Sequence, residues 1–238
     1  MKLIKRFFKL IFKGVLWLFI VSIAITFIYK WLPVPLTPLM IIRSIEQYQA
    51  QKDIVWKHHW VSIDKISKNL QLAVICSEDQ NFLNHNGFDL KAIEKAIEFN
   101  KQGKQIRGAS TISQQTAKNI FLWPQRSWLR KGLEVYFTFL IELMWSKERI
   151  IEVYLNSIEM GNGIYGAGAA SQYWFKKSAN KLTQMESAAI AAILPNPRVY
   201  KANPASNYIH GRKHWIVRQM GYFGPLDYIK QNDKSNKN

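Results

Sequence analysis

The first thirty residues contain the most hydrophobic run in the chain. Residues 14–29 read GVLWLFIVSIAITFIY and carry no charged side chain. With the apolar residues that flank it, this run is long enough to cross roughly 30 Å of hydrocarbon. We therefore predict a transmembrane anchor at 14–32, in preference to a buried core helix. The bulky residues YKWLP that follow do not fit a small-residue cleavage site, so the anchor is predicted to stay on the protein.

The charges around this run predict its orientation. Five cations precede it and one, Lys30, follows it closely. Cations beside a membrane span favour the cytoplasmic side. Residues 1–13 are therefore predicted to be a basic cytoplasmic tail, with the body of the protein on the opposite side of the membrane.

Beyond the anchor, the spacing of apolar residues is mostly helical. The stretch WLPVPLTPLM contains three prolines and predicts an extended linker, so 33–60 is assigned as a linker and membrane-proximal segment. No clear run of alternating β-branched residues follows, and 61–225 is predicted to form a mainly α-helical domain. The basic stretch NKQGKQ at 100–105 is typical of a mobile loop, and 226–238 is predicted to be a disordered tail.

One predicted helix ends in two adjacent carboxylates. Asp64 is a candidate N-cap for this helix. Its apolar stripe, at four-residue steps, consists of Ile66, Leu70 and Val74. The next step is Glu78, so Glu78 is predicted to lie on the apolar side, while Asp79 lies about 100° away around the helix.

Capping patterns mark several later helices. Thr111 and Gln114 form a capping box at the start of ISQQTAKNIFL, and Gln114 and Lys118 share a face. Ser127 is the predicted N-cap of a long helix that ends near residue 145. The predicted apolar side of that helix contains Leu133, Phe137, Leu140, Ile141 and Met144, and its polar side contains Arg130, Lys131, Glu134 and Thr138. Asp89 is predicted to cap a helix, and Thr183 with Glu186 forms a second capping box.

The charge balance narrows the class of partner. The chain has 33 lysines and arginines against 16 acidic residues, a net charge of +17. Such a chain favours nucleic acid, anionic lipid or a phosphorylated substrate. Nucleic acid is disfavoured, because the cations do not alternate with aromatic residues as in a stacking platform, and the anchor directs the body away from the cytoplasm. The single cysteine, Cys76, excludes an intramolecular disulfide.

Three motif matches do not predict function. GNGIYG at 161–166 matches a dinucleotide-binding pattern, but a helical segment precedes it where a strand is required. Two S-x-x-K matches lack the accompanying S-D-N and K-T-G elements of serine acyl-transfer enzymes. DQNFLNHNG lacks the central glycine and the final carboxylate of a calcium loop.

The candidate chemistry is carried by two glutamates and nearby cations. A carboxylate on an apolar face has a raised pKa, which suits Glu78 to general acid or base catalysis. Glu134 lies beside Arg130 and Lys131, and Lys118 and Arg126 precede them. This combination suggests glycosyl chemistry in which one partner carries phosphate. For Glu134 and Arg130 the alternative is an ordinary helical ion pair.

Five segments in order resemble the motifs of a known family. They read EDQNFLNHNGFD, RGASTISQQTAKNIFL, RKGLE, KERIIEVYLN and GNGIYGAGAASQYWF. They resemble the motifs of the peptidoglycan glycosyltransferases, the family that polymerises lipid II, and the resemblance runs from about residue 60 to 200. With one membrane span and no penicillin-binding domain, the chain is similar to the monofunctional members. Ala109 departs from the glycine that is usual there.

The resemblance implies a lysozyme-like helical domain with an inverting mechanism. Glu78 would be the general base that takes the proton of the acceptor C4 hydroxyl. The resemblance implies that Lys118 and Arg126 neutralise the leaving pyrophosphate, that Arg130 and Lys131 add to this effect, and that Glu134 orients these cations or a divalent metal. Ser110, Thr111 and Gln114 would line the donor side. Asp79 and His85 complete the predicted substrate site, with Asp79 expected to brace the turn together with His85.

The resemblance also implies partners and a location. The partners would be lipid II, the growing glycan strand, the lipid bilayer and other cell-wall synthesis or division proteins, with no nucleic acid and no transpeptidase activity. The resemblance does not establish a required cofactor, and a Mg²⁺ ion at the pyrophosphate is an open alternative. The predicted location is the inner membrane, with the catalytic domain in the periplasm. Two alternatives are a muramidase-like hydrolase and an inactive scaffold of the cell-wall machinery.

Overall fold

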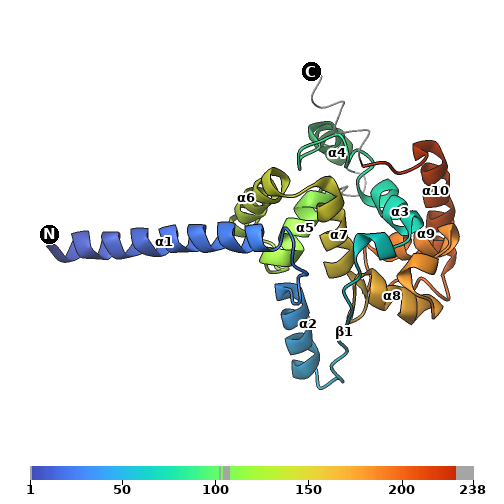
Figure 1. Ribbon diagram of the computed structural model, residues 1–238, viewed down its shortest axis with the longest axis horizontal. Coiled ribbons are helices and arrows are strands. Elements are labelled where there is room, and N and C mark those ends of the chain that lie inside the picture. Colours follow the sequence, from blue (N-terminus) through green and yellow to red (C-terminus); the bar gives the residue numbers. More distant parts are fainter. Residues whose placement is uncertain (1, 102, 104–107, 229–238) are drawn as a thin grey trace. The chain divides into compact units, whose positions relative to one another are not determined.

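The computed structural model describes residues 2–101, 103 and 108–228 (Figure 1). The chain divides into two units, one that ends at Pro33 and one that begins at Val34. The predicted loop at 100–105 and the predicted tail at 226–238 lie partly outside the described residues, whereas Asn100 and Lys101 belong to a helix.

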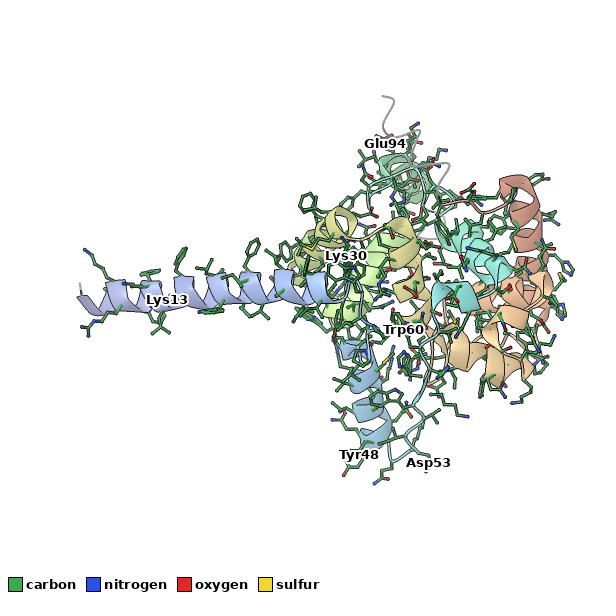
Figure 2. The ribbon with its side chains drawn as sticks, viewed as in Figure 1. Lys13, Lys30, Tyr48, Asp53, Trp60 and Glu94 are labelled. Atoms are coloured by element: carbon green, nitrogen blue, oxygen red, sulfur yellow. The ribbon has the colours of Figure 1, made fainter. Side chains whose placement is uncertain are left out.

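The first unit contains a single helix, α1 (Lys2–Ile28). Its stretch Ile4–Ile28 has the length and composition of a membrane span, which is compatible with the predicted anchor. Figure 2 shows apolar side chains projecting around the helix along most of its length. The helix includes the described residues 2–13 of the predicted cytoplasmic tail and ends before the predicted span limit at 32. Lysine and arginine are good helix formers, so the basic tail continues the helix, and Pro33 disfavours a helical residue before it.

The second unit contains nine α-helices among the described residues. They are α2 (Pro38–Gln49), α3 (Lys68–Glu78), α4 (Leu90–Lys101), α5 (Ile112–Phe121), α6 (Trp128–Met144), α7 (Lys147–Ser157), α8 (Gly166–Phe175), α9 (Gln184–Ile193) and α10 (Asn207–Phe223). Two short 3₁₀ helices and three short strands complete it: η1 (Ile63–Lys65), η2 (Ala179–Lys181), β1 (Lys57–His58), β2 (Glu159–Gly161) and β3 (Ile164–Tyr165). The predicted mainly α-helical fold is confirmed.

The helices form two neighbouring packing groups (Figure 1). The alanine-rich helix α9 is buried along most of its length and packs against both α3 and α10. Helix α5 packs against α6 and α7. The end of α3 and the start of α5 therefore meet where the two groups join, and this junction holds the candidate site.

Most of the predicted caps are present, and one is wrong. The Thr111–Gln114 and Thr183–Glu186 capping boxes both form. Asp89 Oδ1 accepts from the Ala92 amide at 3.0 Å, and Ser127 caps α6. The predicted cap Asp64 lies instead in η1. Because Ile66 adopts an extended conformation, it separates η1 from α3, and Ser67 becomes the N-cap of α3.

The predicted linker 33–60 contains a packed helix. Thr37 caps α2, and its hydroxyl accepts from the Met40 amide at 3.3 Å. Pro38 occupies the first turn, where a missing N–H costs nothing, so this proline starts the helix instead of breaking it. Val34 and Met40 are buried, and α2 packs on α5.

Helix α6 has its predicted polar side facing inward. Arg130, Glu134 and Thr138 are buried. The exposed side is apolar and includes Trp128 (90% exposed), Leu129, Val135, Phe139 and Leu143. On the predicted apolar side, Leu140 and Ile141 are buried as expected, so the exposed apolar residues form a third side that the periodicity did not identify. Arg130 and Glu134 tolerate burial because they pair with each other.

The glycine-rich segment after α7 forms a short hairpin. Strands β2 and β3 pair antiparallel, and β1 joins β3 in parallel. Gly163 has φ +71, and a Cβ there would lie 2.1 Å from the carbonyl oxygen of Val55. Gly166 has φ +78, and its Cβ would lie 2.6 Å from the Asn156 carbonyl oxygen. These glycines are required for close backbone packing, which explains the GNGIYG pattern without a nucleotide.

Gly163→Ala should lower the free energy of unfolding by about 2 kcal/mol or more, because it adds both backbone strain and a clash with Val55. Thermal denaturation checks this. The matched control is Gly132→Ala on α6, where a Cβ would contact nothing within 4 Å. That substitution should leave stability unchanged or raise it by up to about 1 kcal/mol. Equal stability of the two variants would contradict the packing role of Gly163.

Candidate active site

Glu78 is the last residue of α3, and its carboxylate is half-buried. Gln115 Nε2 donates to Glu78 Oε2 at 3.1 Å, and Ser77 Oγ donates to Glu78 Oε1 at 3.3 Å. Burial raises the pKa of Glu78, while the hydrogen bonds and the charge of Arg212 oppose this shift. A carboxylate with a raised pKa is a stronger base once it is deprotonated, as general base catalysis requires.

Gln115 connects Glu78 to a buried tyrosine. The hydroxyl of Tyr154 donates to Gln115 Oε1 at 3.1 Å. The amide oxygen of Gln115 is therefore held by Tyr154, and its NH₂ group faces Glu78. Gln114, and not Gln115, was predicted from the sequence to belong to the site. Gln114 is buried, and its side chain forms the capping box with Thr111. The sequence feature that could have identified Gln115 is its i, i+3 spacing from Lys118.

Asp79 has a different role from Glu78. Its two carboxylate oxygens lie 3.0 and 2.9 Å from His85 Nε2, and Oδ2 also accepts from the Ile112 amide at 2.9 Å. The predicted contact between Asp79 and His85 is confirmed. Only 7% of Asp79 is exposed, so this carboxylate braces the turn after α3 and holds the start of α5.

Thr111 joins the same framework. Its hydroxyl donates to the Gly87 carbonyl oxygen at 2.7 Å and accepts from the Gln114 amide at 3.2 Å. The side chains of Thr111 and Gln114 thus have structural partners. Ser110, by contrast, is exposed at the cavity described next.

A cavity of about 730 Å³ opens beside Glu78. It lies between the end of α3, helix α4, residues 108–111 and α10, and Asp79 and Ser110 also line it. Its lining cations are Lys91, Lys95 and Arg212. Arg212 was not among the site residues predicted from the sequence. Its Nη2 lies 3.3 Å from the Ser77 carbonyl oxygen, and its charge opposes the rise in the pKa of Glu78. The only sequence signal for it is a cation on the last amphipathic helix.

The second part of the candidate site is a cluster on α5 and α6. Glu134 is only 3% exposed. Arg130 Nη1 donates to Glu134 Oε2 at 2.7 Å, and Lys131 Nζ donates to Glu134 Oε1. Glu134 and Glu78 both interact electrostatically with the ammonium group of Lys118. Burial lowers the pKa of Lys118, and the two glutamates oppose that shift. Lys118 therefore interacts electrostatically with both the cluster and Glu78.

Arg126 is not brought into this cluster. It lies on the exposed connection between α5 and α6. Within the described residues, no hydrogen bond or ion pair holds its guanidinium group.

Cations hold both carboxylate oxygens of Glu134. A role for Glu134 in orienting these cations fits this geometry. Among the described residues, no three His, Cys, Asp or Glu side chains are grouped to hold a metal ion by themselves. The alternative in which Glu134 orients a divalent metal at the pyrophosphate stays a prediction.

Comparison with known proteins identifies the family. A family model described as transglycosylase matches residues 45–221. A biosynthetic peptidoglycan transglycosylase of Bacteroides thetaiotaomicron is 54% identical over 217 residues, which cover 91% of this chain and 88% of that protein. One of Shewanella oneidensis is 48% identical over 233 residues, covering 98% of this chain and 99% of that protein.

These matches cover nearly all of the helical domain and define a glycosyltransferase of lysozyme-like fold, as the sequence predicted. The chain belongs to the transglycosylase family and is similar throughout to biosynthetic peptidoglycan transglycosylases.

Tyr154→Phe should raise the pKa of Glu78 further. Without the tyrosine hydroxyl, the amide of Gln115 is free to turn away, and the hydrogen bond that lowers the pKa of Glu78 is weakened. NMR titration of the Glu78 carboxyl carbon in the full chain measures this. The control is Tyr165→Phe, which removes a buried hydroxyl with no hydrogen-bond partner in the described residues. The Glu78 pKa should not change in that control. An unchanged Glu78 pKa in Tyr154→Phe would contradict the role of Tyr154 in orienting Gln115.

Proposed function

We propose that this transglycosylase polymerises lipid II into β-1,4-linked glycan strands and releases undecaprenyl pyrophosphate. The observation that carries this proposal is the half-buried Glu78, which has a raised pKa and lines a cavity. Lys118 interacts electrostatically with both Glu78 and the cluster on α6. The names of the relatives support peptidoglycan as the product.

In the proposed reaction, Glu78 acts as the general base. The acceptor sugar occupies the cavity with its C4 hydroxyl against the Glu78 carboxylate. As the hydroxyl oxygen forms a bond to the anomeric carbon of the donor, its proton moves to Glu78. The bond from the anomeric carbon to the pyrophosphate oxygen breaks on the opposite side, so the α-linkage becomes β. Gln115 keeps the carboxylate oriented throughout.

Cationic side chains stabilise the leaving pyrophosphate. Lys118 is the proposed contact nearest the reacting atoms, and Arg130 and Lys131 extend the positive field. Arg130 Nε is buried and lacks an acceptor within the described chain, so this guanidinium retains hydrogen-bonding capacity. Arg126 is proposed to reach the pyrophosphate from its exposed connection. Glu134 is proposed to orient Arg130 and Lys131. The alternative, in which it orients a Mg²⁺ ion at the pyrophosphate, stays a prediction.

The exposed face of α6 supports a lipid-linked substrate. Its apolar residues, with Phe139 60% and Leu143 68% exposed, lie on the same helix as Arg130 and Glu134. A large exposed apolar face marks contact with lipid or protein. We propose that this face contacts the bilayer and that the lipid carrier is held beside it. Membrane attachment through α1, with the N-terminus cytoplasmic and the domain periplasmic at the inner membrane, completes the proposal.

Hydrolysis of finished glycan is the competing function, since one glutamate in a lysozyme-like fold suits bond cleavage as well. The cations beside Glu134 favour transfer from a pyrophosphate donor instead. Incubation with lipid II and, separately, with finished peptidoglycan distinguishes the two. We expect polymer from lipid II and no cleavage of peptidoglycan.

No transpeptidase activity is proposed, because S-D-N and K-T-G are absent from the sequence.

Glu78→Gln should abolish polymerisation of lipid II, because the amide cannot accept the hydroxyl proton. Glycan formation is measured by gel electrophoresis of labelled product, and circular dichroism confirms that the helices remain. Glu94→Gln on the exposed side of α4 is the matched control and should polymerise normally. Substantial polymerisation by Glu78→Gln would remove Glu78 from the role of base.

Lys118→Ala should reduce the polymerisation rate by at least about 10², because it removes a positive charge from the leaving group in a partly dry site. Initial rates at saturating lipid II provide the measurement. Lys118→Arg retains the charge and should recover a substantial part of the rate. If the alanine variant works at a near-normal rate, Lys118 has only a structural role.

A further inference from the structure

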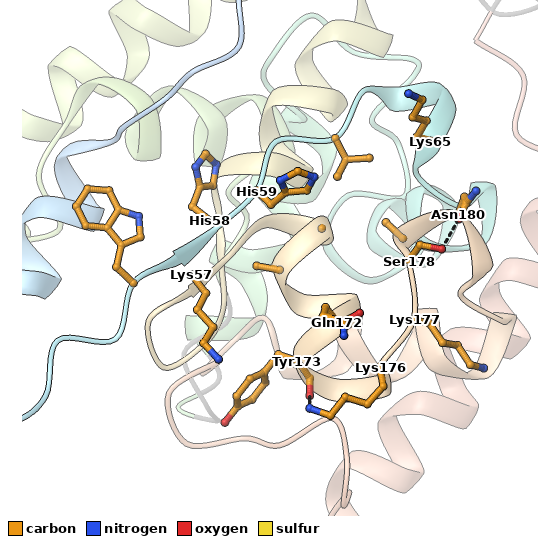
Figure 3. Close-up of a pocket in the computed structure, with 15 residues that line it drawn as sticks. Lys57, His58, His59, Lys65, Gln172, Tyr173, Lys176, Lys177, Ser178 and Asn180 are labelled. Carbon is orange, nitrogen blue, oxygen red and sulfur yellow. Dashed lines mark hydrogen bonds between the residues drawn. The ribbon is translucent and has the colours of Figure 1, made fainter.

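A second cavity, of about 810 Å³, lies away from Glu78. It is formed by β1 and the segment that follows it, by α8 and by η2 (Figure 3). It shares no lining residue with the Glu78 cavity. The reaction proposed above leaves this cavity without a role.

The charge of this cavity is entirely positive. Its lining residues include Lys57, Lys65, Lys176 and Lys177 together with His58 and His59, and no aspartate or glutamate lines it. Lys177 is neutralised by Glu186 at 2.6 Å. Within the described residues, Lys57, Lys65 and Lys176 have no ion-pair partner. Three unneutralised lysines around one hollow favour an anionic ligand.

Tyr173 brings two of these lysines together. The Nζ atoms of Lys57 and Lys176 lie 5.6 and 6.0 Å from the centre of its ring. Figure 3 shows both lysines directed toward Tyr173 at one end of the cavity, with Lys65 at the other. The negative face of the ring partly offsets the repulsion between the two ammonium groups. A carboxylate at this end would interact favourably with both ammonium groups, so this end favours a negatively charged group.

A glycine in the first turn of α8 fixes the wall of the cavity. A Cβ at Gly168 would lie 2.7 Å from both the His59 carbonyl oxygen and Val61 Cγ2. Helix α8 therefore packs directly on the segment after β1. Gly163, in the hairpin before α8, permits a similar close approach to Val55, just before β1. These two glycines thus hold the chain on either side of β1 against the hairpin and α8.

The neutral lining groups suit a saccharide. Gln172, Ser178 and Asn180 present amide and hydroxyl groups in the centre of the cavity and beside Lys65 (Figure 3). Ser178 Oγ donates to Asn180 Oδ1 at 2.7 Å, which fixes the amide. Trp56 is 44% exposed and supplies a flat apolar surface. Such polar groups fix orientation in a ligand cavity, while an aromatic ring supplies contact area.

We propose that this cavity is a second binding site, for a saccharide chain that bears carboxylate groups. In the context of the proposed function, on which this inference rests, the ligand is the glycan strand with its acidic peptide stems. The carboxylates bind Lys57 and Lys176 at one end and Lys65 at the other. The sugar amides and hydroxyls bind the neutral groups between them. An anionic membrane surface is a poorer fit, because it binds basic segments that lie flat on it, whereas these lysines line a hollow.

Binding of soluble, uncrosslinked glycan strands with free stem carboxylates tests the proposal. The full chain is kept in detergent micelles, and its affinity is measured by a fluorescence titration. The double variant Lys57→Gln, Lys176→Gln should bind at least about tenfold more weakly than the unmodified chain, because two charge-assisted contacts are lost. The matched control Lys181→Gln, Lys201→Gln removes two exposed lysines outside the cavity and should bind normally.

Three further binding measurements identify the ligand. Strands whose carboxylates are converted to amides should bind the unmodified chain as weakly as the free-acid strands bind the double variant. Vesicles of anionic lipid and inorganic phosphate should bind the unmodified and double-variant chains alike. Equal glycan affinity of the unmodified chain and the double variant would overturn the proposal. Loss of vesicle or phosphate binding instead of glycan binding would also overturn it, by assigning the lysines to a lipid or free phosphate.

The polymerisation assay separates this inference from the proposed function. If lipid II is polymerised but the two chains bind glycan equally, the second site is wrong and the function stands. If lipid II is not polymerised but the difference in glycan binding persists, the function is wrong and the saccharide site stands.

Discussion

The geometry of the active site depends on the buried carboxylate of Asp79. It accepts a hydrogen bond from the first amide of α5, at Ile112, and contacts His85 in the turn that follows α3. The end of α3 and the start of α5 are therefore held together by one side chain. Glu78 immediately precedes Asp79, and Gln115 follows Ile112 by less than one helical turn. The position of Gln115 against Glu78 thus follows from the bond between Asp79 and Ile112.

Glu78, at the end of α3, and Lys118, on α5, carry opposite charges, and both are partly removed from water. Burial raises the pKa of Glu78 and lowers that of Lys118, so desolvation favours the neutral form of each. The charge of Glu78 opposes part of this shift at Lys118 and so favours its charged form. In such an environment a base binds a proton strongly and a cation acts over a longer range than in water. Those are the two properties that glycosyl transfer from a pyrophosphate requires.

Much of the fold followed from local sequence patterns, because caps and apolar periodicity depend on neighbouring residues. The capping box at Thr111 and the placement of Glu78 on the buried side of its helix are examples. The inward-facing polar side of α6 did not follow, because amphipathicity alone does not reveal that Arg130 and Glu134 satisfy each other inside the protein. Gln115 and Arg212 were missed for a related reason. Their partners, Glu78 and Ser77, are far away along the chain and meet them only after the helices pack.

The pH dependence of kcat/KM for lipid II polymerisation tests the central claim most directly. Glu78 must be deprotonated to accept the hydroxyl proton, and its pKa in the folded protein is raised. Activity should therefore fall as the pH drops through a single ionisation that lies above the pKa of an ordinary glutamate, about 4.3. A rate that stays constant down to that pH, while the protein remains folded, would contradict the account of Glu78 as a desolvated general base.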